Sequence, residues 1–520
     1  MLDGYKTYDA NTPTWLKSLS VILFLFLPAL AVGVLATFGH DIRLALAAAI
    51  ALAMATLMFA KPETTTVVVL FVLYANLSVV AMNAYKVPEL LAASFFVLLG
   101  LPFLNYVFVR RQQIVTNRIF FLMILYLCVL LISAAFSANP DDSISRIAGF
   151  IIEGLALYFL IINAVRTPTM VRWGVWAIVL AGMFMGSITL YQEVTGDYDN
   201  DFGGLAKVKA SEVKTGEVDI FGKEIKRRRL SGTLGSKNRY AQVMVVLLPF
   251  ALMLIGSERK WWLRSLAALA CVPIVTGALL TFSRGAGIAI IFTILAMTLL
   301  RIIKPWHFVL IAITGYLIVI AIIPEYIYRI STVVDLESIA QGNVEEAGGS
   351  IRSRSNVNLA TFNIFLDYPL LGVGPGQTNQ YTSSYGNEIG TFYRALDNTR
   401  RAHNMFLEEL ADTGAIGFTL FVGIALITMY QVWRVRQYGK IKRRPEITYT
   451  AAGFFLAILA YMVTAMFLHL SYVRYYWFLL AFAAAFVQVY RTQAKEDETE
   501  EAVAMQSILM KATGRKRASQ

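Results

Sequence analysis

Arg401, His403 and Asn404 stand close together where a long polar stretch of the sequence gives way to an apolar run. The chain has only four histidines, so a histidine among arginines at such a boundary calls for an explanation. It could accept the proton of an attacking hydroxyl, or only orient that hydroxyl through a hydrogen bond. The alternatives are an interfacial histidine and, for Asn404, a helix N-cap. Gly414 and Gly417 follow inside the run, where their spacing is typical of a close helix contact.

Other arginines stand at similar boundaries. Arg239 comes just before one apolar run, and Arg284 lies in a short turn between two runs. Guanidinium groups have the right shape to bind phosphate oxygens, and half-buried ones need an anionic partner. For Arg239 and Arg284 the alternative is that the side chain simply extends to the lipid headgroups. The cations that we predict around an anionic substrate are Arg239, Arg284, Arg352, Arg354, Arg400 and Arg401.

Metal chemistry has little support. Asp197, Asp199 and Asp201 alternate as at the start of a calcium loop, but the glycine and the final glutamate of such a loop are missing from the required positions. The same aspartates fit the metal-holding pair of nucleotide-sugar transferases, yet we expect them on the face away from the nucleotide pool. No phosphate-cradling loop followed by Lys-Ser or Lys-Thr is present in the sequence. We therefore predict no metal site and no cofactor.

The composition indicates a membrane protein. Of 520 residues, 57% are hydrophobic and 15% are charged, which is more apolar surface than a soluble protein can bury. The net charge of +12 falls mainly in short connections between apolar runs, so it indicates membrane topology rather than nucleic-acid binding. We predict an all-α, polytopic protein with about 12–14 transmembrane helices. The expected spans are 18–38, 42–60, 64–83, 88–108, 117–137, 144–164, 171–193, 238–256, 262–282, 285–303, 306–323, 405–432, 447–468 and 471–490.

The basic connections place the N-terminus in the cytoplasm and two long polar loops on the outer face. We predict a small hairpin around Gly222 in the first loop and an amphipathic helix from Arg354 to Leu366 in the second. The charged C-terminal tail is expected to be weakly ordered. The segments are 1–193 (N-terminal transmembrane helices), 194–237 (first extracytoplasmic loop), 238–324 (central transmembrane helices), 325–404 (large extracytoplasmic loop), 405–490 (C-terminal transmembrane helices) and 491–520 (cytoplasmic tail).

Four motifs, in order, resemble those of the O-antigen ligase and O-antigen polymerase superfamily of bacterial membrane glycosyltransferases. The most specific motif is His403-Asn404, followed after nine residues by Gly414 and after two more by Gly417. This spacing is similar to the ligase signature. The resemblance extends from about Leu205 to Tyr490. Two features depart from the family: the predicted spans exceed the usual dozen, and the threonines expected after Gly417 are reduced to Thr419. The other motifs are Arg229-Leu-Ser-Gly-Thr-Leu-Gly-Ser-Lys-Asn238, Ser283-Arg284-Gly285, and Arg354 leading to Pro369-Leu-Leu-Gly372-Val-Gly374.

The resemblance implies a donor glycan carried on undecaprenyl pyrophosphate and transfer on the outer, periplasmic face of the bacterial inner membrane. It implies catalytic roles for His403, Arg284 and Arg354. Arginines that cover the leaving phosphates stabilise the charge developing there, so we expect a metal-independent reaction that inverts the anomeric carbon. The predicted substrate-binding residues are Arg229, Asn238, Arg239, Arg352, Arg400, Arg401 and Asn404.

The motifs fit more than one acceptor. A ligase would use the lipid A–core of lipopolysaccharide, a polymerase would use a growing O-antigen or exopolysaccharide, and a protein O-oligosaccharyltransferase would use a protein. A flippase or exporter of lipid-linked glycans is the alternative from a different class. It would need cations throughout the depth of the membrane, whereas the cations here cluster at the predicted outer end.

Overall fold

The computed structural model describes residues 55–87, 94–218, 224–322, 347–388, 401–468 and 474–517. Within these ranges the regular secondary structure is helical apart from one hairpin. Seven of the described helices are long and apolar enough to cross a membrane, or eight if one bent pair is a single span. The predicted fold class, an all-α polytopic membrane protein, is confirmed. The predicted span 18–38 and most of 42–60 lie outside the described residues.

The elements before and within the first polar loop are α3 (Pro62–Tyr74), α4 (Leu77–Tyr85), the 3-10 helix η1 (Ser94–Leu99), α6 (Gly100–Leu104), the π-helix η2 (Asn105–Val109), α7 (Arg118–Ala135), α8 (Pro140–Gly149), the π-helix η3 (Phe150–Ala156), α9 (Leu157–Ala164), α10 (Pro168–Thr195), β1 (Val208–Val218), β2 (Glu224–Leu230) and the 3-10 turn η4 (Gly232–Leu234). Those that follow are α11 (Lys237–Ser257), α12 (Trp261–Leu279), α13 (Arg284–Leu299), α14 (Pro305–Ile322), α17 (Ala347–Asp367), α18 (Thr378–Glu388), α19 (Met405–Ile441), α20 (Pro445–Ala465) and α21 (Arg474–Arg517).

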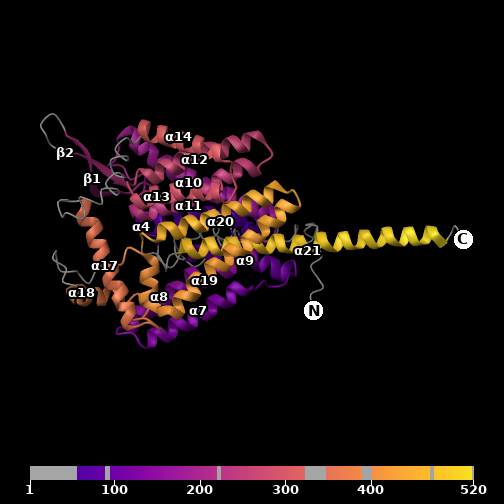
Figure 1. The fold of residues 1–520 in the computed structure, drawn as a ribbon, viewed down its shortest axis with the longest axis horizontal. Helices are drawn as coiled ribbons and strands as arrows, with labels where there is room; N and C mark the ends of the chain where they lie inside the picture. Colours follow the sequence, from indigo (N-terminus) through magenta and orange to yellow (C-terminus); the bar gives the residue numbers. More distant parts are fainter. Residues whose placement is uncertain are drawn as a thin grey trace, which may run out of the picture.

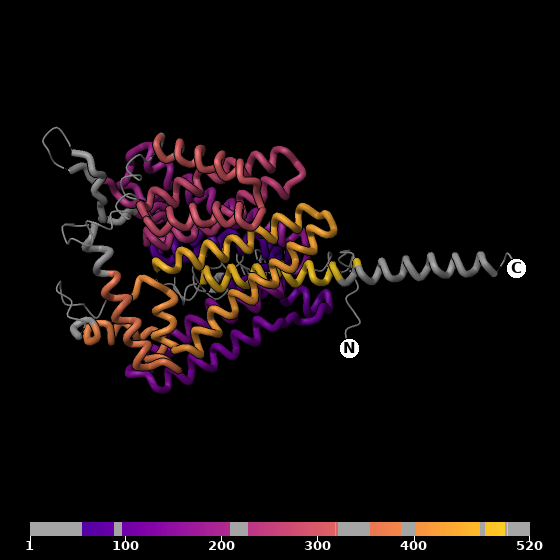
Figure 2. The backbone as a smooth tube through the Cα atoms, in the orientation of Figure 1, coloured from indigo at the N-terminus to yellow at the C-terminus, as the bar shows by residue number. Residues whose placement is uncertain are grey.

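Helix α11 lies at the centre of the bundle. In its apolar stretch 78% of the residues are buried, compared with 39% for α7. It packs against α12 and α20, and α20 packs against α19; Figure 2 shows the arrangement of these helices. Large apolar side chains such as Phe121 on α7 and Leu269 on α12 are 60% and 56% exposed, as expected where helices face lipid.

The predicted span 64–83 is wrong in one respect, because the structure breaks it into α3 and α4, which meet at 59°. At the break Asn76 adopts a left-handed conformation with a φ of 62°, which asparagine tolerates better than most residues. Its side-chain amide donates to the carbonyl of Thr233 at 2.9 Å, and its side-chain oxygen accepts from Arg474. Partners distant in sequence therefore stabilise a bend that hydrophobic periodicity does not reveal.

The described parts of both polar loops lie at one end of the bundle, the loop end, and α21 extends from the other (Figure 1). The first loop contains the predicted hairpin, in which β1 and β2 pair antiparallel and are longer than expected. The second contains the predicted amphipathic helix, α17, which buries Val357, Ala360 and Ile364. This helix ends at Asp367, just before Tyr368-Pro369, because proline disfavours helical geometry before it.

Helix α21 continues without a break to Arg517, through the tail that was predicted to be weakly ordered. Residues 494–510 contain neither glycine nor proline and are rich in alanine, glutamate and methionine. These residues have high intrinsic helix propensity. The helix therefore persists beyond the apolar part of the sequence.

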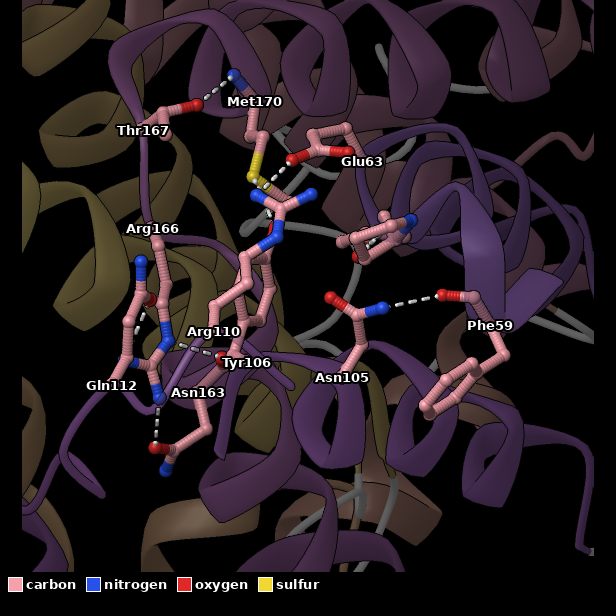
Figure 3. Close-up of polar contacts among 12 residues, drawn as sticks. Phe59, Glu63, Asn105, Tyr106, Arg110, Gln112, Asn163, Arg166, Thr167 and Met170 are labelled. Atoms are coloured by element: carbon pink, nitrogen blue, oxygen red, sulfur yellow. Dashed lines mark hydrogen bonds and ion pairs between the residues drawn. The ribbon is translucent and has the colours of Figure 1, made fainter. Parts of the chain in front are cut away.

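Opposite the loop end, Arg110 and Arg166 flank the ring of Tyr106 (Figure 3), and their guanidinium carbons lie 5.0 and 5.2 Å from its centroid. Arg110 also pairs with Glu63 at 2.7 Å, and Arg166 donates to the side chain of Asn163 at 3.0 Å. These contacts join the connection after η2 to α3 and α9. Both arginines stand in basic connections between apolar runs, and in the structure they also hold helices together.

A buried carboxylate joins α10 to the end of α11. Glu258 is 3% exposed and accepts two hydrogen bonds from Arg172, at 2.8 and 2.6 Å, and one from Trp176 at 2.8 Å. Burial alone would raise the pKa of Glu258, but the hydrogen bonds from Arg172 and Trp176 outweigh burial and hold this pKa below its ordinary value. The ionised form of Glu258 is thus the one that stabilises the fold.

We expect Arg172→Ala to lower the free energy of unfolding by about 2 kcal/mol at neutral pH, since it leaves a buried carboxylate with fewer hydrogen bonds. Because the folded pKa of Glu258 is depressed, its contribution is present above the ordinary carboxyl pKa and is lost as the pH falls through the folded value. Thermal unfolding of wild type and variant in detergent should therefore differ at neutral pH and converge in acid. A difference that stayed constant with pH would contradict this role.

Candidate functional site

One pocket at the loop end brings together cations from three distant parts of the chain. It is partly open to solvent, and the space within it, including that open part, is about 480 Å³. Its cations are Arg229 at the end of β2, Arg284 at the start of α13 and Arg354 in α17. No aspartate or glutamate is found among the described residues of its lining, so the pocket is strongly cationic. The other lining residues are Asn238, Ala241, Gln242, Phe282, Ser283, Gly285, Ala286, Thr464, Phe467 and Leu468.

Arg229 holds the turn that presents Arg284. It is 8% exposed, and its guanidinium donates to the carbonyl of Thr281 at 2.6 Å and to the carbonyl of Phe282 at 3.3 Å. It also donates to Asn238 Oδ1 at 3.2 Å. Phe282 has a φ of 51°, a conformation that a non-glycine residue keeps only when its surroundings hold it there. Arg229 therefore adds charge to the pocket and positions the backbone that leads to Arg284.

Arg354 reaches the pocket from the second polar loop. Burial lowers the pKa of Arg354 below its ordinary value, and no nearby carboxylate offsets that effect within the described residues. An anion in the pocket would stabilise its charged form. One turn further along α17, Val357 packs against Ala402. This contact places the turn that contains His403 beside the same helix.

The turn before α19 contains Arg401, His403 and Asn404. The Asn404 side chain accepts hydrogen bonds from the N–H groups of Phe406 and Leu407, at 3.0 and 3.3 Å, so the expected helix cap is confirmed. Arg401 pairs at 2.9 Å with Glu408, which is 1% exposed. His403 is half-buried and does not line the pocket itself. The cap and the ion pair hold it at the mouth of α19, next to α17.

Helix α19 is broken at Gly414, and the interpretation of Gly414 and Gly417 as a close helix contact is wrong. Gly414 has a φ of 64° and a ψ of −171°, a region that essentially only glycine occupies. The backbone at the break bonds to the segment after α17, where the N–H of Ala415 donates to the carbonyl of Pro369 at 2.8 Å. A Cβ at Gly417 would lie nearest to Thr413 of its own helix. The glycine pair thus marks a joint with a loop.

Asp412 fastens that loop to α19. Its carboxylate is fully buried and accepts from the N–H of Gly376 at 2.8 Å, and from the N–H and hydroxyl of Thr378 at 3.0 and 2.6 Å. Gly372 has a φ of 68°, and a Cβ there would lie 2.4 Å from the carbonyl oxygen of Ala411. The glycine-rich motif after α17 and the broken helix are therefore two halves of one packed joint.

We expect Asp412→Asn to lower the free energy of unfolding by about 2 kcal/mol, because the amide cannot accept all three hydrogen bonds and presents its own donors to N–H groups. The loop from 372 to 378 should also exchange its amide hydrogens faster, which hydrogen-exchange mass spectrometry would detect. Thr378→Val removes only the hydroxyl bond and should have the smaller effect. Equal protection of this loop in wild type and Asp412→Asn would refute the anchoring role.

The structure brings four predicted site residues into the pocket and three into the adjoining turn. Arg239 is in neither group. Its Nε is buried without a hydrogen-bond partner among the described residues, and it interacts electrostatically with Tyr461 of α20 and with Arg401. Arg400 lies outside the described residues, and only the helix backbone is described at Arg352. In the pocket are Arg229, Asn238, Arg284 and Arg354, and in the turn are Arg401, His403 and Asn404.

Four further residues were not predicted from the sequence: Gln242 and Thr464, which line the pocket, Glu408, which pairs with Arg401, and Asp412, which supports the joint. A signal was available for each of them. All four are polar or acidic side chains within apolar spans, where such residues are costly unless they have a partner or a function.

Comparison with known protein families finds a match to a family model described as O-antigen ligase, over residues 269–422. The matched stretch runs from α12 into α19 and contains Arg284, Arg354 and His403. Arg229 and Asn238, which complete the polar side of the pocket, lie before it. A search of curated proteins finds no match to the chain.

Proposed function

Because this chain belongs to the O-antigen ligase superfamily and is a membrane glycosyltransferase of the ligase or polymerase type, we propose that it moves a glycan from undecaprenyl pyrophosphate to an acceptor hydroxyl. We place this transfer on the outer face of the bacterial inner membrane. The observation that carries this conclusion is the pocket in which Arg229, Arg284 and Arg354 meet with no carboxylate in its described lining. The pyrophosphate of the donor is the anion that such a group of guanidinium groups suits best.

The arginines act on the leaving group. As the bond between the anomeric carbon and the pyrophosphate oxygen breaks, its electron pair passes to that oxygen. Arg284 and Arg354 then stabilise the growing negative charge on that oxygen. The oxygen of the acceptor hydroxyl forms the new bond from the opposite side, which inverts the anomeric carbon. The guanidinium groups supply the positive charge that the leaving group needs, so we assign no metal ion and no cofactor.

His403 acts on the acceptor. From its turn beside α17 it accepts the proton of the attacking hydroxyl, or fixes the direction of that hydroxyl by a hydrogen bond. The three acceptor classes, lipid A–core, a growing polysaccharide and a protein, all supply such a hydroxyl. The arginine pocket serves the donor that they share.

Reconstitution in sealed vesicles tests the proposal. Undecaprenyl-pyrophosphate-linked glycan and a glycan acceptor are added to the outside only, so that a protein exposing its loop end needs no transport step. We expect a glycosidic product without movement of donor to the inner leaflet. Movement of the donor across the bilayer without product would instead support a flippase and would refute the transferase.

A further inference from the structure

We propose, resting on the proposed function, that Asn238 and Gln242 form a subsite for the first sugar of the donor, the one bonded directly to the pyrophosphate. The two amides lie one helical turn apart on α11 and line the same pocket as the three arginines. Nothing in the family motifs assigns Gln242 a role. It stands in a segment that is otherwise almost entirely apolar.

Gln242 is a buried polar side chain whose NH₂ group is held by the protein. It is 1% exposed, and its Nε2 donates to Thr464 Oγ1 at 2.9 Å. The Thr464 hydroxyl in turn donates to the carbonyl of Tyr461 at 2.8 Å, so the amide is held in one orientation. Because its NH₂ group is engaged in this way, Oε1 is the group that Gln242 can offer to a ligand in the pocket that it lines.

Asn238 supplies the complementary donor. Its Oδ1 is occupied by the hydrogen bond from Arg229 at 3.2 Å, which leaves its NH₂ group to donate into the pocket. Residues four apart on a helix project from the same face, with Cβ atoms about 5–6 Å apart. The pocket therefore presents a donor and an acceptor side by side, next to the cations. Sugar hydroxyls and amide substituents both donate and accept, so they match this pair.

The pocket is partly open to solvent, so a glycan can extend out of it from the arginines. With the pyrophosphate on the arginines, the first sugar is the next group along the donor and falls within reach of Asn238 and Gln242. Later sugars must extend out of the pocket toward the loop end. We infer that the chain selects its donor by this first sugar.

The test measures binding of three lipids to the full chain in nanodiscs. The probes are undecaprenyl pyrophosphate, the same lipid carrying one glucose, and the same lipid carrying one N-acetylglucosamine. Wild type should bind at least one sugar-bearing lipid about tenfold more tightly than the sugar-free lipid, the gain expected from one or two net hydrogen bonds. Gln242→Leu should bind the sugar-free lipid as wild type does but lose the preference for sugar.

Thr428→Val is the matched control, since it removes a fully buried hydroxyl from α19 away from the pocket and should keep the wild-type preference. If Gln242→Leu does not fold, the unbranched Gln242→Met takes its place. A sugar preference that survives loss of the Gln242 amide, or wild type that binds all three lipids equally, would overturn the subsite. Wild type that binds none of the pyrophosphate lipids would overturn the proposed function itself.

Discussion

Arg284→Ala should lower the rate of glycan transfer by about 10²–10³-fold or more, the usual cost of removing a group that stabilises charge in the transition state. Arg284 opens α13, where its side chain enters the pocket. The hydrogen bonds from Arg229 to the preceding turn fix that position. Alanine is well tolerated in the first turn of a helix, so the variant should remain folded and inserted. The measurement is the rate of product formation per amount of folded protein.

Two further variants make this result specific. Arg284→Lys keeps the charge but loses the two-pronged geometry suited to phosphate, so its activity should lie between wild type and alanine. Arg434→Ala removes an exposed arginine from the part of α19 distant from the pocket and should transfer at the wild-type rate. Wild-type activity in Arg284→Ala would show that the pocket does not stabilise the leaving group.

Gly414→Ala should destabilise the protein by about 3 kcal/mol or more, because its backbone conformation is essentially restricted to glycine. A Cβ at this position would lie 2.2 Å from the carbonyl of Leu370, so the loop after α17 would have to move away. That movement would break the hydrogen bond between Ala415 and Pro369 and displace α17, which contributes Arg354 to the pocket. We therefore expect both a lower thermal unfolding temperature in detergent and a loss of transfer.

Gly423 provides the matched control in the same helix. No atom lies within 4 Å of a Cβ built there, and the residue is part of regular helix. Gly423→Ala should therefore be neutral or stabilising by up to about 1 kcal/mol, because alanine has the higher helix propensity. The same unfolding temperature in Gly414→Ala and Gly423→Ala would show that the break in α19 does not need glycine.

The helices of the bundle could largely be predicted from the sequence, because backbone groups in lipid must bond within their own segment. The run 238–256 becomes α11 at Lys237–Ser257 for this reason. The hairpin and α17 could also be predicted, since turn residues and Pro369 mark their ends. An element whose ends are set by nearby residues can therefore be predicted from the sequence of that stretch alone.

The breaks could not be predicted, because they depend on partners far away in the chain. The bend at Asn76 is held by Thr233, and the break at Gly414 is completed by Pro369. The sequence showed a glycine pair with the spacing of a helix contact, and only the fold reveals the positive φ at Gly414 and the loop that packs against it. Tertiary hydrogen bonds overrode the local pattern at both positions.

The candidate site was predicted in part. Motif spacing identified Arg284 and Arg354, and the fold places both in one pocket. Gln242 belongs to no motif, and its polarity within an apolar span was the only signal for it. Arg239 matched the expected pattern of boundary cations, but it does not line the pocket and interacts instead with Tyr461 of α20 and with Arg401. An arginine at a membrane boundary therefore predicts positive charge at that boundary. Which groups its side chain contacts depends on its position around the helix.

The most direct test of the central claim is a transfer assay with the purified chain in nanodiscs, comparing wild type with Arg284→Ala and His403→Ala. Nanodiscs enclose no compartment, so transport across a membrane cannot produce the signal. Undecaprenyl-pyrophosphate-linked glycan and an acceptor are supplied together, and the new glycosidic product is measured by mass spectrometry. We predict product from wild type and none above background from either variant. Product from both variants at the wild-type rate would contradict the assignment of transfer to the arginine pocket and His403.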